Sequence, residues 1–233
     1  MRARAHRLAV MPPGSSDARA ELAALCARGL DWVADDSRTL ANPEGARLAA
    51  VLVLFGVLDS TPAHAVGPVA RDLDVLLQRR SATMGHHPGQ ISFPGGGVEP
   101  ADLDMPATAL REAVEETGLD PLGVEILGTL PELALPVSNN LVTPVPAWWT
   151  RVSEVAAVDH RETVDVFRVP VADLLDPANR ASVVRPWRGS LLRSPAFTVG
   201  GVTVWGFTAI VLARMFDELD WAVPWDQART VEP

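Results

Sequence analysis

The sequence predicts an α/β/α sandwich built on a mixed β-sheet. Strand-length runs of valine and leucine alternate along the chain with segments of helical periodicity, and no repeat or low-complexity block interrupts them. The composition, with 48% apolar and 21% charged residues, is that of an ordinary globular protein. At 233 residues, the chain is long enough for one large domain with a sizeable core.

The N-terminal part, residues 1–47, is expected to be an arm followed by a helix. Asp17 could cap this helix, because apolar residues then recur at helical spacing at Leu22, Leu25 and Leu30. Nothing in this part suggests chemistry. We expect it to pack on the rest of the chain or on a partner subunit, so a homodimer is one of the alternatives left open.

Residues 48–219 are expected to form the main domain. Residues 48–58 are rich in valine and leucine and end at the turn-forming residues 59–62, which predicts a buried strand. Two consecutive glycines at the centre of residues 197–204 predict a β-hairpin. Further strands are expected at residues 72–79, 91–93, 124–129, 141–149 and 163–169.

Helices are expected between these strands and after them. The first starts at Asp104, a favourable N-cap, and Pro106 suits its first turn, where a missing N–H costs nothing. Gly118 supplies its stop. Two further helices and a tail that lies against the surface are expected at residues 171–175, 207–219 and 220–233.

The helix expected between Asp104 and Gly118 has three carboxylates on one face. Glu112, Glu115 and Glu116 stand at i, i+3 and i+4, and like charges at this spacing repel by roughly 0.2–0.5 kcal/mol per pair. A divalent cation reverses the sign, and Mg²⁺ prefers oxygen ligands. A solvated glutamate-rich helix face is the alternative. The preceding glycine loop, residues 93–97, favours a metal site that faces a phosphate-bearing substrate.

The same stretch resembles the signature of the Nudix hydrolases, G-x5-E-x7-R-E-U-x-E-E-x-G-U, in which U is a bulky apolar residue. The matching residues are Arg111, Glu112, Ala113, Glu115, Glu116, Gly118 and Leu119. The chain departs from the signature at Leu103, where a glutamate is expected. The coenzyme A pyrophosphatase branch of the family has its acids earlier, and this chain has Glu99, Asp102 and Asp104 there.

A second, upstream pattern resembles the same branch, L-L-T-x-R-S followed by H-x-G and F-P-G-G. The chain reads Leu76 to Ser81, then His87, Gly89 and residues 93–96, and it departs only at Gln78, where the pattern has threonine. The resemblance covers roughly residues 48–216. It implies the α/β/α sandwich and a metal-dependent hydrolase of the diphosphate bond of coenzyme A and its derivatives. The products would be 4′-phosphopantetheine and adenosine 3′,5′-bisphosphate.

The resemblance also implies roles for residues. Glu112, Glu115 and Glu116, with a backbone carbonyl of the glycine loop such as that of Gly96, would bind Mg²⁺ or Mn²⁺. The metals would neutralise the diphosphate and lower the pKa of a bound water. Arg111 would orient a glutamate by a charge-assisted hydrogen bond. The general base would be Glu116 itself or a glutamate on a later loop, for which Glu162 is the candidate. The residues expected to contact the substrate are Arg79, Arg80, Ser81, His87, Gly95 and Gly97.

Bulk properties narrow the class of partner. The net charge of −9 argues against non-specific nucleic-acid binding, which needs a basic surface. Residues 48–58 are too short to span a bilayer, and the arginine-rich start lacks the apolar region of a signal peptide. The single cysteine, Cys26, fits a reducing compartment. We therefore expect a cytoplasmic protein that acts on a small molecule.

Two alternatives to coenzyme A hydrolysis stay open at this point. The same fold and metal site would serve a hydrolase of ADP-ribose, a nucleotide sugar or a dinucleotide. A non-catalytic nucleotide-binding module is the other alternative, although it would have no need of three crowded carboxylates.

Overall fold

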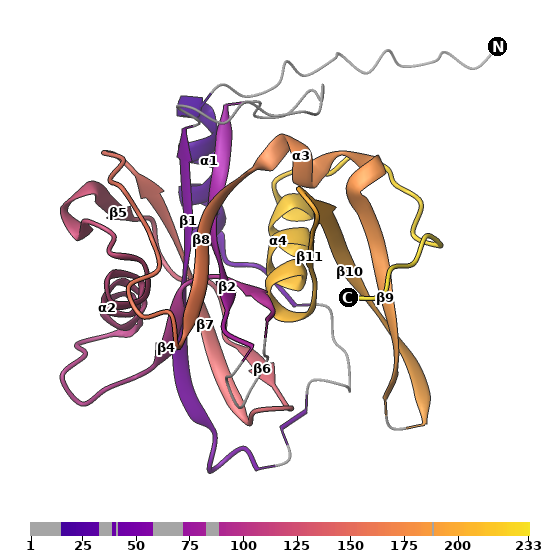
Figure 1. The fold of residues 1–233 in the computed structure, drawn as a ribbon, viewed down its shortest axis with the longest axis horizontal. Coiled ribbons are helices and arrows are strands. Elements are labelled where there is room, and N and C mark those ends of the chain that lie inside the picture. The colour runs from indigo at the N-terminus through magenta and orange to yellow at the C-terminus, as the bar shows by residue number, and fades with distance from the viewer. Residues whose placement is uncertain (1–14, 33–38, 41, 58–71, 83–88, 188) are drawn as a thin grey trace.

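The computed structural model describes residues 15–32, 39–40, 42–57, 72–82, 89–187 and 189–233. Its centre is a mixed sheet in which β1 (Arg47–Val57) and β7 (Asn140–Trp149) run parallel, and every other described pair is antiparallel (Figure 1). The sheet order is β3-β2-β1-β7-β5, with β4 added to β1, β6 to β7 and β8 to β2. The remaining strands are β2 (Leu73–Arg80), β3 (Ile91–Ser92), β4 (Gly95–Gly97), β5 (Val124–Ile126), β6 (Leu133–Leu135) and β8 (Thr163–Pro170).

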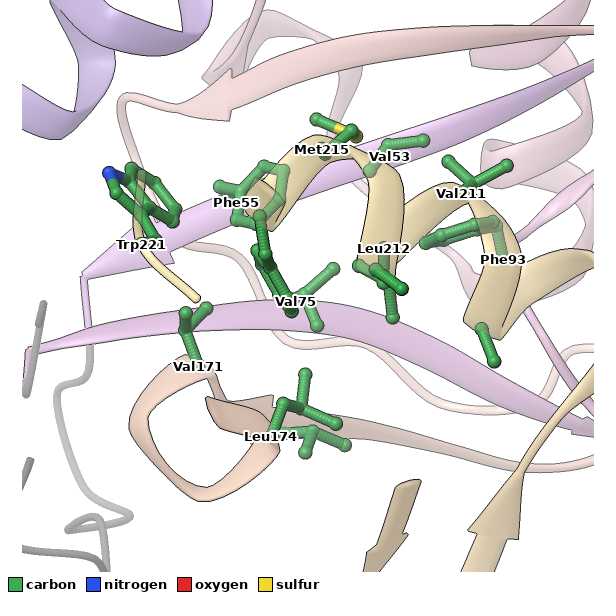
Figure 2. Close-up of a cluster of buried hydrophobic side chains, with 14 of the residues drawn as sticks. Val53, Phe55, Val75, Phe93, Val171, Leu174, Val211, Leu212, Met215 and Trp221 are labelled. Atoms are coloured by element: carbon green, nitrogen blue, oxygen red, sulfur yellow. The ribbon is translucent and has the colours of Figure 1, made fainter. Parts of the chain in front are cut away.

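Helices cover both faces of this sheet. Alternate residues of β1 point to opposite faces. Leu52 and Leu54 pack with α2 (Met105–Thr117), whereas Val53 and Phe55 pack in a second cluster with α1 (Ser15–Arg28) and α4 (Gly206–Glu218). Figure 2 shows the α4 side of the sheet, where Val211, Leu212 and Met215 meet the strand residues. The predicted α/β/α sandwich with a mixed sheet is therefore confirmed.

A second, three-stranded sheet adds a layer that the sequence did not predict. It consists of β9 (Arg180–Trp187), β10 (Ser190–Val199) and β11 (Val202–Val204) in the order β11-β10-β9. Helix α4 lies between this sheet and the central one (Figure 1), and Phe197 of β10 meets Phe216 of α4 edge-on at 6.2 Å between ring centres. The predicted hairpin is confirmed, with φ of 58° at Gly200 and 77° at Gly201.

The segment that follows α4 contacts the N-terminal helix. Trp221 is buried and stacks on Phe216, and its ring nitrogen donates a 2.6 Å hydrogen bond to Glu21 of α1. Farther along, the tail runs beside β9, where Ser182 N donates to Arg229 O at 2.8 Å. Helix α1 thus packs on the domain itself. It begins at Ser15, so Asp17 lies inside the helix and is not its N-cap.

Short connecting elements complete the chain. Helix α3 (Val171–Leu175) stands where it was predicted, and two 3-10 turns follow α2 and α3 at Pro121–Gly123 and Pro177–Asn179. None of the helices in the described part of the chain is both long and apolar enough to cross a membrane.

Candidate active site

The helix with the carboxylates, α2, has the limits that its sequence predicts. The Asp104 carboxylate accepts a 2.8 Å hydrogen bond from Ala107 N, and a proline stands in the first turn. At the other end Gly118 adopts a left-handed conformation with φ of 69°, and its N–H donates to Val114 O at 2.9 Å. Ala109 and Ala113 are fully buried against the sheet. Glu116 is buried beside them and Glu112 is mostly buried, whereas Glu115 lies farther round the helix and is 58% exposed.

The glycine segment in front of this face is a strand, β4, and not the open loop expected from the sequence. Gly95 pairs with Val51 and Gly96 with Ala50 of β1. A Cβ on Gly95 would lie 2.4 Å from the backbone oxygen of Ala50, and one on Gly96 would lie 2.4 Å from the Glu112 carboxylate. Two of the glycines are therefore required by close approach, one to the sheet and one to the helix.

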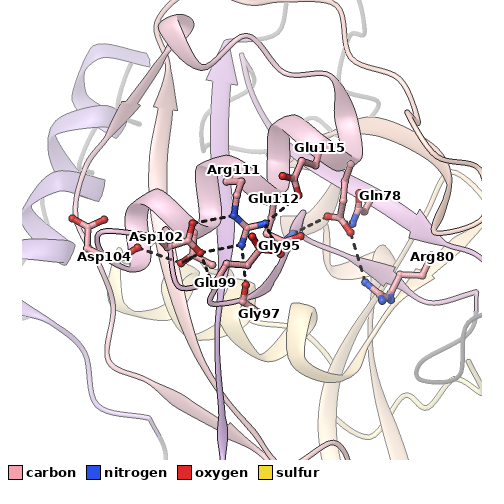
Figure 3. Close-up of polar contacts among 12 residues, drawn as sticks. Gln78, Arg80, Gly95, Gly97, Glu99, Asp102, Asp104, Arg111, Glu112 and Glu115 are labelled. Atoms are coloured by element: carbon pink, nitrogen blue, oxygen red, sulfur yellow. Dashed lines mark hydrogen bonds and ion pairs between the residues drawn. The ribbon is translucent and has the colours of Figure 1, made fainter.

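Arg111 is the centre of the polar contacts in front of α2 (Figure 3). Its Nε and Nη2 donate to the two oxygens of Asp102 at 2.9 and 3.0 Å. Its Nη1 donates to Glu112 and to Glu115, at 3.0 Å each, and Nη2 also donates to the Gly97 carbonyl at 2.9 Å. Arg111 thus contacts two of the three glutamates, Glu112 and Glu115.

Asp102 is a site residue that sequence reasoning named only as an early acid. Its carboxylate accepts hydrogen bonds from Arg111, from Glu99 N at 2.8 Å and from Thr108 Oγ1 at 2.9 Å. The Arg111 guanidinium, followed by the Glu99 amide, holds the pKa of Asp102 well below its ordinary value. Leu103, at the position where the signature has glutamate, is 94% exposed. The sequence signal that could have identified Asp102 is its position directly before Leu103.

Glu116 differs from the other two glutamates because it turns toward the sheet. Its side chain is 9% exposed, and its Oε2 accepts from Gly95 N at 2.8 Å and from Gln78 Nε2 at 2.7 Å. Burial raises the pKa of Glu116 to about 7, against the opposing effect of these hydrogen bonds and of Arg80. Burial also raises the pKa of Glu112, which Arg111 partly offsets. Removing water from a carboxylate disfavours its charged form.

The three glutamates offer the oxygen chemistry that a hard cation needs. Within the described residues, Glu112 Oε2, Glu115 Oε1 and Glu116 Oε1 accept no hydrogen bond. The absence of a side chain at Gly96 lets the Glu112 carboxylate lie against the backbone of β4. However, no three acidic, histidine or cysteine side chains of the described segments are gathered closely enough to hold one ion. Shared binding would therefore require Glu112 and Glu115, which now contact Arg111, to change rotamer.

The other predicted residues are divided between the site and its surroundings. Arg80 lies on the α2 face of β2, with its Nη1 4.0 Å from Glu116 Oε1. Arg79 follows Leu77 on the opposite face, which the alternation of the strand requires, so the two arginines do not act side by side. His87 lies outside the described residues.

Ser81 and Glu162 are brought together at the end of β2. Ser81 is buried, and its N–H donates to the backbone oxygen of Glu162 at 2.7 Å. The Glu162 side chain is exposed and stands outside the contacts around Arg111. The structure thus places Glu162 beside the Arg80–Ser81 segment.

Comparison with known proteins gives the same picture. A family model described as the NUDIX domain matches residues 61–187, more than half of the chain. The chain is 34% identical over 150 residues to Nudix hydrolase 22, chloroplastic, of Arabidopsis thaliana, a match that covers 61% of this chain and 49% of that protein. It is 32% identical over 167 residues to an uncharacterized Nudix hydrolase, NudL, of Cronobacter sakazakii, which covers 68% of this chain and 82% of that protein.

The matches differ in extent. The chain spans about half the length of two plant relatives, Nudix hydrolases 22 and 15 of Arabidopsis thaliana, at 49% and 52%. A crystal structure of a Nudix hydrolase from Nitrosomonas europaea superposes with a TM-score of 0.45 and 13% identity, covering 78% of this chain and 77% of that one. On the family model and the sequence relatives, the chain belongs to the Nudix hydrolase family.

Proposed function

We propose that this Nudix hydrolase cleaves the diphosphate bond of coenzyme A and its derivatives, giving 4′-phosphopantetheine and adenosine 3′,5′-bisphosphate. The observation that supports it best is the 4.0 Å approach of Arg80 to Glu116. Arg80 belongs to the upstream pattern that resembles the coenzyme A branch, and Glu116 belongs to the carboxylate helix. The two sequence patterns therefore meet in one place, where an arginine stands next to a buried carboxylate.

Mg²⁺ or Mn²⁺ would be held by Glu112, Glu115 and Glu116, with the carbonyl of Gly96 as a further donor. A bound divalent cation supplies neutralisation of the diphosphate charge and a more acidic water. Arg111 keeps two of the glutamates in front of the helix, and Asp102 keeps Arg111 in place.

The protein groups that remain divide the work on the substrate. Arg80 offers a guanidinium, which binds phosphate in a bidentate way. In the hydrolysis, a water oxygen forms a bond to one phosphorus while the bond from that phosphorus to the bridging oxygen breaks. A carboxylate accepts the proton of the water, and the candidates are Glu116 and Glu162. Glu116 is buried in the carboxylate cluster, whereas Glu162 is exposed beside the Arg80–Ser81 segment.

The test compares coenzyme A with dephospho-coenzyme A, which lacks only the 3′-phosphate. We expect wild type to prefer coenzyme A in kcat/KM, because charge-assisted recognition of a phosphate is worth about 1.5–3 kcal/mol, or roughly ten- to a hundredfold. Arg80→Ala should erase most of this ratio. Arg80 also lies beside Glu116, so both substrates should lose some turnover, and the ratio separates this common loss from loss of phosphate recognition.

The companion variant Arg79→Ala distinguishes the two arginines, which lie on opposite faces of β2. If Arg79→Ala loses the preference for coenzyme A over dephospho-coenzyme A and Arg80→Ala keeps it, the 3′-phosphate binds on the face of β2 that carries Arg79. A wild type without any preference, with faster turnover of ADP-ribose or a dinucleotide, would refute the proposal in favour of another Nudix substrate. No Mg²⁺-dependent turnover of any of these compounds would favour a non-catalytic module.

A further inference from the structure

We propose that Gln78 is a positioning residue, which fixes the oxygen of Glu116 that the site offers to a cation. This inference rests on the proposed function, in which Glu116 is a metal ligand. Gln78 is also the residue at which the chain departs from the threonine of the upstream pattern.

The first observation is the burial of a polar side chain. Gln78 is 0% exposed in the middle of the sheet, on the α2 face of β2. The residue two places before it on the same face, Leu76, is apolar and equally buried. A buried amide costs free energy unless its hydrogen-bonding groups have partners. An apolar residue would satisfy the packing at this position, so the amide needs another reason.

The second observation is what the amide contacts. Its Nε2 donates to Glu116 Oε2 at 2.7 Å, and its Oε1 accepts from Thr163 Oγ1 at 3.3 Å. A carboxylate that binds a cation is ionised and only accepts, so in that form the NH₂ group of the amide faces Glu116 and the carbonyl faces Thr163, as it does here. Thr163 is itself buried and directly follows Glu162. Gln78 thus links α2 to β8 through β2.

The consequence concerns the two oxygens of Glu116. Oε2 accepts from both Gln78 and Gly95 N, which uses its two lone pairs. Oε1 accepts no hydrogen bond within the described part of the chain and faces Arg80 at 4.0 Å. Gln78 and Gly95 together therefore hold the carboxylate in one orientation, with Oε1 toward the arginine side. A threonine at position 78 has its hydroxyl two bonds nearer the backbone and would reach less far toward Glu116.

The experiment measures Mn²⁺ binding by titration calorimetry, without substrate, alongside urea unfolding. Gln78→Met keeps the length of the side chain and removes the donor. We expect its Mn²⁺ affinity to fall by about ten- to a hundredfold, the usual effect of losing a group that orients a metal ligand. The matched control is Leu76→Met. Leu76 lies on the same strand and the same face as Gln78 and packs in the cluster with α2, and a change that conserves volume is well tolerated there. Leu76→Met should bind Mn²⁺ as wild type does.

A second variant approaches the link from its other end. Thr163→Val removes only the hydroxyl that orients the amide, so it should weaken Mn²⁺ binding less than Gln78→Met does. Thr163→Val also tests the inference if Gln78→Met fails to fold. In that case, an Mn²⁺ affinity equal to that of wild type in Thr163→Val would overturn the inference.

The remaining outcomes are distinct. Equal Mn²⁺ binding by wild type and folded Gln78→Met would overturn the inference and leave the proposed function intact. The same weakening in Leu76→Met as in Gln78→Met would show a general packing effect and would overturn it too. A wild type that binds no Mn²⁺ would refute the metal site of the proposed function and this inference together.

Discussion

The three glycines of β4 provide the sharpest test of how the sheet and the carboxylate helix meet. Each substitution by alanine adds the same methyl group, but the three methyl groups meet different neighbours. At Gly95 the new Cβ would lie 2.4 Å from Ala50 O and 2.6 Å from Val51 Cα, both backbone atoms of β1. At Gly96 the three nearest atoms would be those of the Glu112 carboxylate, and at Gly97 the new Cβ would meet nothing within 4 Å.

Gly95→Ala should lose the most stability. Overpacking against a rigid backbone costs about 1–3 kcal/mol. A non-glycine residue at the φ of +154° found here adds strain of about 1–3 kcal/mol. The sum, about 2–6 kcal/mol, is a large part of the about 5–15 kcal/mol that stabilises a typical domain. Gly97→Ala, whose φ is not positive, should stay within about 0.5 kcal/mol of wild type.

Gly96→Ala should separate activity from stability. The end of the Glu112 side chain can swing away, which gives up one partly exposed ion pair with Arg111, worth at most about 1 kcal/mol. The displaced carboxylate is a proposed metal ligand, so turnover should fall by about ten- to a hundredfold.

Urea unfolding followed by tryptophan fluorescence measures the free energy of unfolding of each variant, and Mg²⁺-dependent hydrolysis measures its turnover. Equal free energies of unfolding for Gly95→Ala and Gly97→Ala would contradict the close approach of Gly95 to β1. A Gly96→Ala variant as active as wild type would contradict the role of Glu112 as a metal ligand.

Three further predictions concern single side chains. Asp102→Asn should lower turnover by about ten- to a hundredfold because it loosens Arg111, whereas Asp104→Asn should change little because asparagine caps a helix as well as aspartate does; equal activity of the two variants would count against the role of Asp102. Glu162→Gln should lower kcat without weakening Mn²⁺ binding, and an unchanged kcat across the pH range would return the role of base to Glu116. Burial raises the pKa of Cys26 to about 11, so only about a thousandth of this thiol is ionised at pH 8 and it should react slowly with a thiol reagent, faster as pH rises; reaction at the rate of a free thiol would contradict this.

The local chemistry of the sequence determined the carboxylate helix and the hairpin. Helix α2 begins after Asp104 and ends before Gly118, as predicted, because capping depends on residues within a few positions of each other. The same holds for the turn at Gly200 and Gly201, where two positive φ angles need glycine. Strong alternation and apolar runs likewise located β1, β2, β7 and β8 to within a few residues.

Tertiary structure decided which side chains act together. The hydrogen bond from Gln78 to Glu116 joins residues 38 positions apart, and the opposite placement of Arg79 and Arg80 depends on which face of β2 meets α2. The glycine segment is a strand only because β1 supplies its partner, and β9 was missed because its mixed composition gains strand character by pairing with β10. A sequence pattern reports periodicity within a segment, whereas contacts between segments arise only when their faces are packed.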